Sequence, residues 1–494
     1  MKCVRVLIAL AAGLACTANA AELRVLAPIL ENGAPLEKAD PGGRLVPVVT
    51  QVRSGALYTR LQREVSSGFT AAILAMDEEA RRIAGDDVAA PTWLYLSTED
   101  GGFARKGFWL SEGDAQRYVP DPFVDLVVDG ASIENGAFEE IFAHEMGHVF
   151  LRRLLPGLPA GYSRTPHSSL SITDYPTAFD EGFAAHFQGL VRRLTRNPVL
   201  RNQDLGLEFK PFLSYWASNI DRATRIDGMR RNWFVQAQVA PPHEGDSISR
   251  RDQSALFDVA RLKNANQMFA SEGVIATLFY RWLVPGPDER QVLLDRYSRI
   301  FRAIRKMNEH ELNPDSAVFL DVLERYCEQF PQERDHALAL VVDTTYGVTA
   351  DPGSAPRVES LAAIGRGGDM RGFVSGLEST RTRLAEVHEM VRKSPRMLRA
   401  GLGPDLWLLG APGERTTEGV RPTINLNSAE LEDLLQIEGL DRVSAERALS
   451  SRRAAGPYRD LADFLTRNRV DSDAARLLED AARAAREAGT HSRR

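Results

Sequence analysis

Cysteine is scarce in this chain of 494 residues: there are three, and Cys3 and Cys16 lie close to the N-terminus. If the N-terminal segment is removed, Cys327 remains alone and no internal disulfide can form. The low cysteine content therefore excludes a small disulfide-held scaffold, and a hydrophobic core must stabilise the folded protein. A chain of this length is sufficient for two or three domains.

Long apolar runs and a strong excess of one charge are also missing. After residue 20 no stretch is apolar for long enough to cross a bilayer, so we expect no transmembrane segment. The formal net charge is −6, and this mild acidity argues against a general surface for binding polyanions.

The N-terminus has the composition of a targeting segment. Two basic residues precede a short apolar stretch, and Ala18-Asn19-Ala20 matches the small-x-small cleavage pattern. This predicts a secretory signal peptide over residues 1–20 and an exported protein, either periplasmic or secreted. Cys16 leaves a lipoprotein anchor open as an alternative, although Gly13 stands where a lipobox prefers a large aliphatic residue.

A short motif, His144-Glu145-Met146-Gly147-His148, lies in a stretch with apolar residues at helical spacing and no proline. Two histidines four positions apart project from one face of a helix, close enough to reach one ion. Zinc favours such a nitrogen pair, and Glu145 stands where a general base can act on an activated water. The motif indicates a metallopeptidase; the alternative is a helix with two surface histidines.

A catalytic zinc site needs a third protein ligand. The chain lacks Gly-x-x-His after His148, which excludes the metzincin pattern. A second helix is expected over residues 177–188, and its Glu181-Gly182-Phe183-Ala184 resembles the Glu-Gly-x-Ala pattern of gluzincins. The resemblance implies an α+β, zincin-like domain with a small mixed sheet and active-site helices. It also implies that His144, His148 and Glu181 hold Zn²⁺.

The third ligand has a competitor, because Glu272 also precedes a glycine at the start of a helix-like stretch. Glu181 is the favoured ligand, since Ile275 stands where the family pattern has a small residue. Several gluzincins place an acidic residue four positions after the ligand glutamate, but Ala185 occupies that position here. Asp180 is therefore a candidate to orient a histidine, and His186 is expected to be a cleft or surface residue.

The family usually stabilises the oxyanion with a tyrosine or a histidine, and the sequence leaves that residue open. The candidates are Tyr162, His167, Tyr175, His243 and Tyr280. Short β-branched and aromatic runs between residues 91 and 129 predict the strands of the small sheet. In gluzincins such a sheet supplies an edge strand along which a peptide substrate lies.

The segment from residue 205 to 346 is expected to be mostly helical, with Trp216, Trp233 and Trp282 in the core. Residues 21–350 would form the zincin-like domain with its helical extension. Residues 351–421 would then form a helical segment followed by a linker rich in glycine, proline and threonine.

Residues 422–494 resemble the helix-hairpin-helix domains of bacterial competence DNA receptors and of a type II secretion pseudopilin. This predicts a small all-α module with Gly439 at the hairpin. Glu438 and Asp441 flank that glycine and would repel a phosphate, and residues 423–494 contain 13 acidic and 12 basic residues. We therefore expect the module to dock a protein partner or its own peptidase domain, and not nucleic acid.

The sequence thus predicts an exported zinc peptidase that acts on a peptide or protein substrate, with Glu145 as general base. The alternative is a non-catalytic envelope scaffold or binding protein built on a peptidase fold. In that case the C-terminal module would dock a protein partner or DNA.

Overall fold

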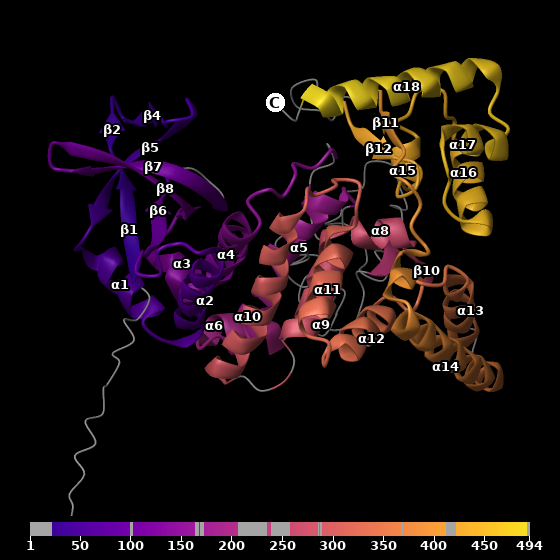
Figure 1. The fold of residues 1–494 in the computed structure, drawn as a ribbon, viewed down its shortest axis with the longest axis horizontal. Helices are drawn as coiled ribbons and strands as arrows, with labels where there is room; N and C mark the ends of the chain where they lie inside the picture. Colours follow the sequence, from indigo (N-terminus) through magenta and orange to yellow (C-terminus); the bar gives the residue numbers. More distant parts are fainter. Residues whose placement is uncertain are drawn as a thin grey trace, which may run out of the picture.

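The computed structural model describes residues 22–98, 102–163, 167, 172–205, 235–238, 257–284, 286, 289–366, 369–411 and 421–491. The predicted signal peptide, Trp216, Trp233 and His243 lie outside these ranges. The described part is a mixed α+β protein with one small sheet and many helices, as expected (Figure 1). None of its helices combines the length and the apolar character needed to cross a membrane.

The N-terminal sheet has the strand order β1-β6-β8-β7-β5-β4, and β1 also pairs with β5, so the sheet closes on itself. Three of its strands lie between residues 91 and 129 as predicted, whereas the chain before residue 90 adds three that the sequence patterns did not indicate. The strands are β1 (Leu23–Pro28), β4 (Glu37–Ala39), β5 (Leu45–Val52), β6 (Thr92–Leu96), β7 (Gly102–Glu112) and β8 (Ala115–Leu126).

The two faces of this sheet form two separate cores because side chains alternate along each strand. Trp93, Phe108 and Phe123 point inside the closed sheet and meet edge to face, with ring centroids 5.2 and 5.5 Å apart. Leu94 and Val124 point outward into the main core shared with the helices. The outward face therefore forms the surface against which the helices pack.

The helices, the first two of which lie between β5 and β6 in the chain, form the body of the molecule. They are α1 (Ala56–Val65), α2 (Gly68–Ala84), α3 (Gly130–Asn135), α4 (Ala137–Leu154), α5 (Tyr175–Leu194), α6 (Pro198–Leu205), α8 (Ala265–Phe269), α9 (Glu272–Leu283), α10 (Arg290–Lys306), α11 (Val318–Gln329), α12 (Arg334–Thr344), α13 (Ser354–Arg366) and α14 (Met370–Lys393). The short strands β9 (Gln236–Gln238) and β10 (Phe257–Leu262) interrupt the region predicted to be mostly helical. Trp282 is buried in the core, as predicted.

Small residues allow α4, α5 and α9 to approach closely. A Cβ atom on Gly147 of α4 would lie 2.7 Å from the Cα of Ala184 on α5. A Cβ on Gly182 of α5 would lie 2.6 Å from the Cβ of Ile275 on α9. The two small residues that follow Glu181 in the pattern therefore contact different helices. Ala184 packs against α4, which carries the histidine motif, and Gly182 packs against α9.

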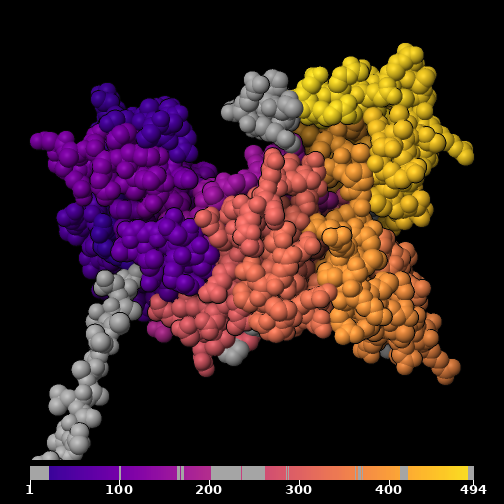
Figure 2. Space-filling view, in the orientation of Figure 1, coloured from indigo at the N-terminus to yellow at the C-terminus, as the bar shows by residue number. Residues whose placement is uncertain are grey.

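The main core extends without a break from Leu23 to Leu398, so the boundary predicted at residue 350 does not coincide with a break in packing. A third core, separate from the other two, extends from Leu408 to Ala482 and defines the C-terminal domain. In Figure 2 the sheet and the C-terminal domain stand at opposite ends of the helical body.

The prediction of an all-α C-terminal module is wrong in one respect. Strands β11 (Trp407–Leu409) and β12 (Thr423–Asn425) form an antiparallel pair, and Leu408 and Ile424 lie in this third core. Part of the predicted linker thus belongs to the C-terminal domain. Side chains alternate along each of the two strands, so one face of the pair is apolar and packs against the helices of this domain. Those helices are α15 (Leu431–Leu434), α16 (Arg442–Ala455), α17 (Leu461–Asn468) and α18 (Ser472–His491).

Candidate metal centre

Helix α4 carries His144, Glu145 and His148, and its ends are stabilised by charge. Glu139 and Glu140 occupy its first turn, and two arginines occupy its last turn, an arrangement that complements the helix dipole. The Glu140 carboxylate also accepts a hydrogen bond from Arg192 near the end of α5, at 2.8 Å. The start of α4 is thereby attached to the end of α5.

Helix α5 carries Asp180 and Glu181. It begins after Asp174, whose side chain accepts a hydrogen bond from the backbone N–H of Thr177 at 2.8 Å. Pro176 in the first turn needs no N–H partner and has a helical φ angle. A capped start and a tight crossing with α4 place Glu181 opposite the two histidines.

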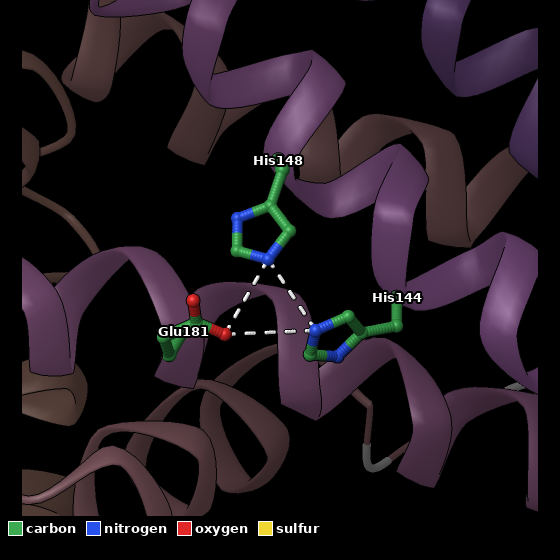
Figure 3. Close-up of side chains that lie close together, drawn as sticks. All are labelled: His144, His148 and Glu181. Atoms are coloured by element: carbon green, nitrogen blue, oxygen red, sulfur yellow. Dashed lines mark hydrogen bonds and ion pairs between the residues drawn. The ribbon is translucent and has the colours of Figure 1, made fainter. Parts of the chain in front are cut away.

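His144, His148 and Glu181 converge on one point, as Figure 3 shows. The two Nε2 atoms are 3.3 Å apart. Glu181 Oε2 lies 3.6 Å from His144 Nε2 and 3.5 Å from His148 Nε2. A tetrahedral zinc ion with bonds of about 2.0–2.1 Å has donor atoms about 3.3–3.4 Å apart. The spacing of these three donors therefore fits such an ion.

The carboxylate at this point lacks an ordinary partner. Among the described residues, Glu181 Oε2 is buried without a hydrogen-bond partner. Burial opposes ionisation of Glu181, but the two imidazoles that face its carboxylate hold the pKa of this carboxyl well below its ordinary value. An ionised carboxylate facing two imidazole nitrogens is a donor set that suits zinc.

Asp180 orients His148. Its carboxylate oxygen lies 2.7 Å from His148 Nδ1, so the other ring nitrogen, Nε2, is turned toward Glu181. Burial opposes protonation, yet Asp180 and Glu181 raise the pKa of His148 well above the ordinary value. Asp180 thus occupies the orienting role that Ala185 cannot fill, and this interaction matches the sequence-based expectation.

Glu145 is buried beside this group, with 5% of its surface exposed. Burial raises the pKa of its carboxyl, and the charges of His144 and His148 oppose that effect. A Cβ atom on Gly102, the first residue of β7, would lie 2.9 Å from Glu145 Oε1. No local pattern singles out Gly102, since its importance depends entirely on this contact.

Glu272 lies on the other side of Glu181, with His167 between the two acids. His167 Nδ1 is 3.4 Å from Glu272 Oε2 and 3.6 Å from Glu181 Oε2. Glu272 therefore groups with His167 and Glu181, and not with the two imidazoles of α4. The geometry favours Glu181 over Glu272 as the third ligand.

The candidates for the oxyanion-stabilising residue lie in different parts of the structure. The Tyr175 hydroxyl is buried against Asn266 Nδ2, at 2.9 Å. The Tyr162 ring lies tilted against that of Trp407 in the C-terminal domain, with ring centroids 6.1 Å apart. Tyr280 is partly buried on α9 and packs against the main core. Only His167 among the described candidates lies within 3.6 Å of a metal-site carboxylate oxygen.

His186 is not a cleft or surface residue, so that expectation is wrong. It is completely buried, and its Nε2 lies 2.9 Å from the hydroxyl of Tyr297 on α10. Burial lowers the pKa of His186 to about 3, so the ring is neutral. The sequence showed its distance around α5 from Glu181, but not that another helix covers this face.

Strand β7 begins beside Glu145. Along residues 102–106 it pairs with β8 on one side, and its pairing with β5 on the other side begins at Trp109. The carbonyl of Lys106 accepts a hydrogen bond from Arg44 Nη2 at 2.5 Å. The first residue of β7, Gly102, thus lies next to Glu145.

The hairpin of the C-terminal domain turns at Gly439, which has a φ of 92°. Asp441 follows it and caps α16, and its carboxylate accepts a hydrogen bond from the backbone N–H of Ser444 at 2.7 Å. A carboxylate thus lies at the N-terminus of α16, and the expectation that the module does not bind nucleic acid stays a prediction.

Comparison with known proteins found no match: no family model, no curated protein and no solved structure matches the chain.

Proposed function

We propose that this protein is an exported zinc-dependent peptidase of gluzincin type. The observation that carries the proposal is the spacing of three donors, 3.3–3.6 Å, between His144, His148 and Glu181. These donors come from two helices and are already arranged for one tetrahedral ion. The neighbouring Asp180 and Glu145 supply the orienting group and the general base that such a site needs.

When bound, zinc supplies a Lewis acid that activates a water molecule for attack on a peptide carbonyl. Glu145 accepts the proton from that water and delivers it to the departing nitrogen. Burial supports this role, because it raises the pKa of Glu145 toward the working range of a general base. Asp180 keeps the His148 ring in one orientation throughout.

His167 is the group that we assign to the oxyanion. It is the described candidate nearest to the metal ligands, and Glu272 holds its ring from the far side. Hydrogen bonding to Glu272 raises the pKa of His167, which favours a protonated ring. A positive donor at this position would stabilise the negative oxygen that develops during attack.

We infer the substrate class from the resemblance to gluzincins, in which an edge strand of the small sheet holds an extended peptide. Here β7 begins at Gly102, beside Glu145. A peptide held in extended form beside this strand would place a carbonyl close to the general base without requiring one side-chain sequence.

The proposal is tested by Glu145→Gln and His148→Ala. Glu145→Gln should keep stoichiometric zinc but lose hydrolysis of an unfolded protein such as casein, because only the base is removed. His148→Ala should lose both zinc and hydrolysis. Zinc is measured by elemental analysis of the purified protein, and hydrolysis by release of peptides.

The chain provides its own controls in the similar segment His388-Glu389 on α14. Glu389→Gln and His388→Ala should retain zinc and activity. Full peptidase activity in Glu145→Gln would contradict the proposal. Stoichiometric zinc without any hydrolysis by the unaltered protein would instead favour a non-catalytic binding protein.

A further inference from the structure

The C-terminal domain docks on α8 through side-chain amides. Asn264 Nδ2 donates to the carbonyl of Asn427 at 3.0 Å, and Gln267 Nε2 donates to the carbonyl of Ser428 at 3.0 Å. Figure 1 shows α15 and β12 next to α8, in agreement with these bonds. Directional bonds to backbone carbonyls fix the orientation of the domain more strictly than apolar contact alone would.

Asn266 extends this docking to the metal site. It is 1% exposed, donates to the carbonyl of Gly403 at 2.9 Å and accepts from the N–H of Gly403 at 3.0 Å. The same Nδ2 atom donates to the Tyr175 hydroxyl at 2.9 Å. Because Tyr175 is the first residue of α5, one buried amide joins the root of the C-terminal domain to the helix of Glu181.

Backbone bonds join the same regions of the chain. The N–H of Thr173, just before α5, donates to the carbonyl of Ala270 at 2.8 Å. Ile172 and Ser271 form an isolated β-bridge. Ala270 and Ser271 connect α8 to Glu272, so the segment on which the domain docks continues directly into the helix that holds His167.

We propose that the C-terminal domain helps to position the metal-site helix α5, with Asn266 and Tyr175 as the positioning residues. The inference rests on the proposed metal site but not on hydrolysis. Glu181 follows Tyr175 by six positions (181 − 175 = 6), about 9 Å along the helix axis. A shift at the start of α5 therefore moves the carboxylate relative to the imidazoles on α4.

The test is Tyr175→Phe in the full chain, because it removes one hydroxyl and leaves the bonds between Asn266 and Gly403. The zinc dissociation constant should rise about three- to tenfold, the range expected for one lost hydrogen bond. In metal-free protein, the backbone amides of residues 175–181 should exchange their hydrogens faster. Competition with a chelator measures the first effect, and hydrogen exchange followed by mass spectrometry measures the second.

Tyr458→Phe is the matched control. Tyr458 is also buried, and its hydroxyl bonds within the C-terminal domain: it donates to the carbonyl of Ala448 at 2.6 Å and accepts from Asn468 Nδ2 at 3.0 Å. This variant should leave zinc affinity and exchange in α5 unchanged. Equal effects of both variants, or unchanged exchange in α5 of Tyr175→Phe, would overturn the inference. If the unaltered protein binds no zinc, the proposed function fails and the exchange experiment alone decides the inference.

Discussion

His167 and Glu272 illustrate what individual residues contribute near the metal ligands. Glu272 is 2% exposed and comes from α9, whereas His167 precedes α5 in the chain. Their hydrogen bond gives the buried Glu272 carboxyl a partner and holds the imidazole beside Glu181. Under the proposed function the same pair has both a structural and a catalytic role, and substitutions can separate the two.

At this scale we predict that His167→Phe lowers kcat about 10²–10³-fold while zinc content is unchanged, as expected for loss of one oxyanion donor. Glu272→Gln should shift the alkaline limb of the kcat/KM profile to lower pH. Glu272 raises the pKa of His167; without this carboxylate the ring loses its proton at lower pH. Steady-state kinetics across pH, with zinc analysis, checks both outcomes.

Glu181→Gln is the companion variant for this experiment. Comparing it with Glu272→Gln distinguishes the glutamate that binds zinc from the glutamate that holds His167. It should lose zinc, whereas Glu272→Gln should keep it. The reverse result, zinc lost on changing Glu272 and kept on changing Glu181, would exchange the roles of the two glutamates.

At the scale of elements, the site depends on how closely α4 crosses α5. The histidines and Glu181 belong to different helices, so their spacing is set by the distance between the helix axes. Gly147 lies between His144 and His148 at the crossing, where a Cβ atom would be 2.7 Å from the Cα of Ala184. Backbone cannot move aside as a flexible side chain can.

We predict that Gly147→Ala destabilises the protein by about 1–3 kcal/mol and weakens zinc binding, because the added methyl group separates the two helices. Urea unfolding measures the free energy, and chelator competition measures the affinity. Gly157→Ala is the control, since no atom lies within 4 Å of its Cβ position. Equal stability of the two variants would show that the crossing adapts without cost.

At the scale of the whole molecule, carboxylates meet where the C-terminal domain joins the helical body. Asp405 lies at the root of the domain, and Asp315 and Asp174 of the body act on it electrostatically. Burial first, and then the charge of Asp315, raise the pKa of Asp405 from 3.8 to about 7. The folded protein thus binds a proton at Asp405 more tightly than the unfolded chain does.

The pH dependence has a definite sign. Well below pH 4 Asp405 is protonated in the folded and the unfolded state, so its burial does not lower the free energy of unfolding. The destabilisation grows as the pH rises from about 4 and is complete above about pH 7. Asp405→Asn should therefore raise the free energy of unfolding by up to about 4 kcal/mol at pH 8, and by progressively less toward pH 4. Urea unfolding at several pH values measures the difference.

Asp473→Asn is the matched control for this measurement, because the Asp473 side chain is 89% exposed. It should change the free energy of unfolding by less than about 0.5 kcal/mol at every pH. A gain from Asp405→Asn that is the same at pH 4 and pH 8 would contradict the electrostatic explanation.

The elements around the site could be predicted from the sequence because their signals are local. Helical spacing and the absence of proline predict α4, and short β-branched and aromatic runs predict β6, β7 and β8. The histidine pair is a local motif as well, and Glu181-Gly182-Phe183-Ala184 stands out by its resemblance to the gluzincin pattern. The same resemblance makes Asp180 a candidate orienting group, because Ala185 occupies the family's acidic position.

Contacts between distant parts of the chain were decided by the tertiary structure. Three such contacts join segments that are separated in the sequence. Helix α10 covers His186, β11 pairs with β12, and Gly102 lies beside Glu145. Packing chooses among many compatible partners, and no local pattern records that choice. The sequence therefore determined which side chains can serve as ligands and base, while tertiary packing determined which of them meet and which are buried.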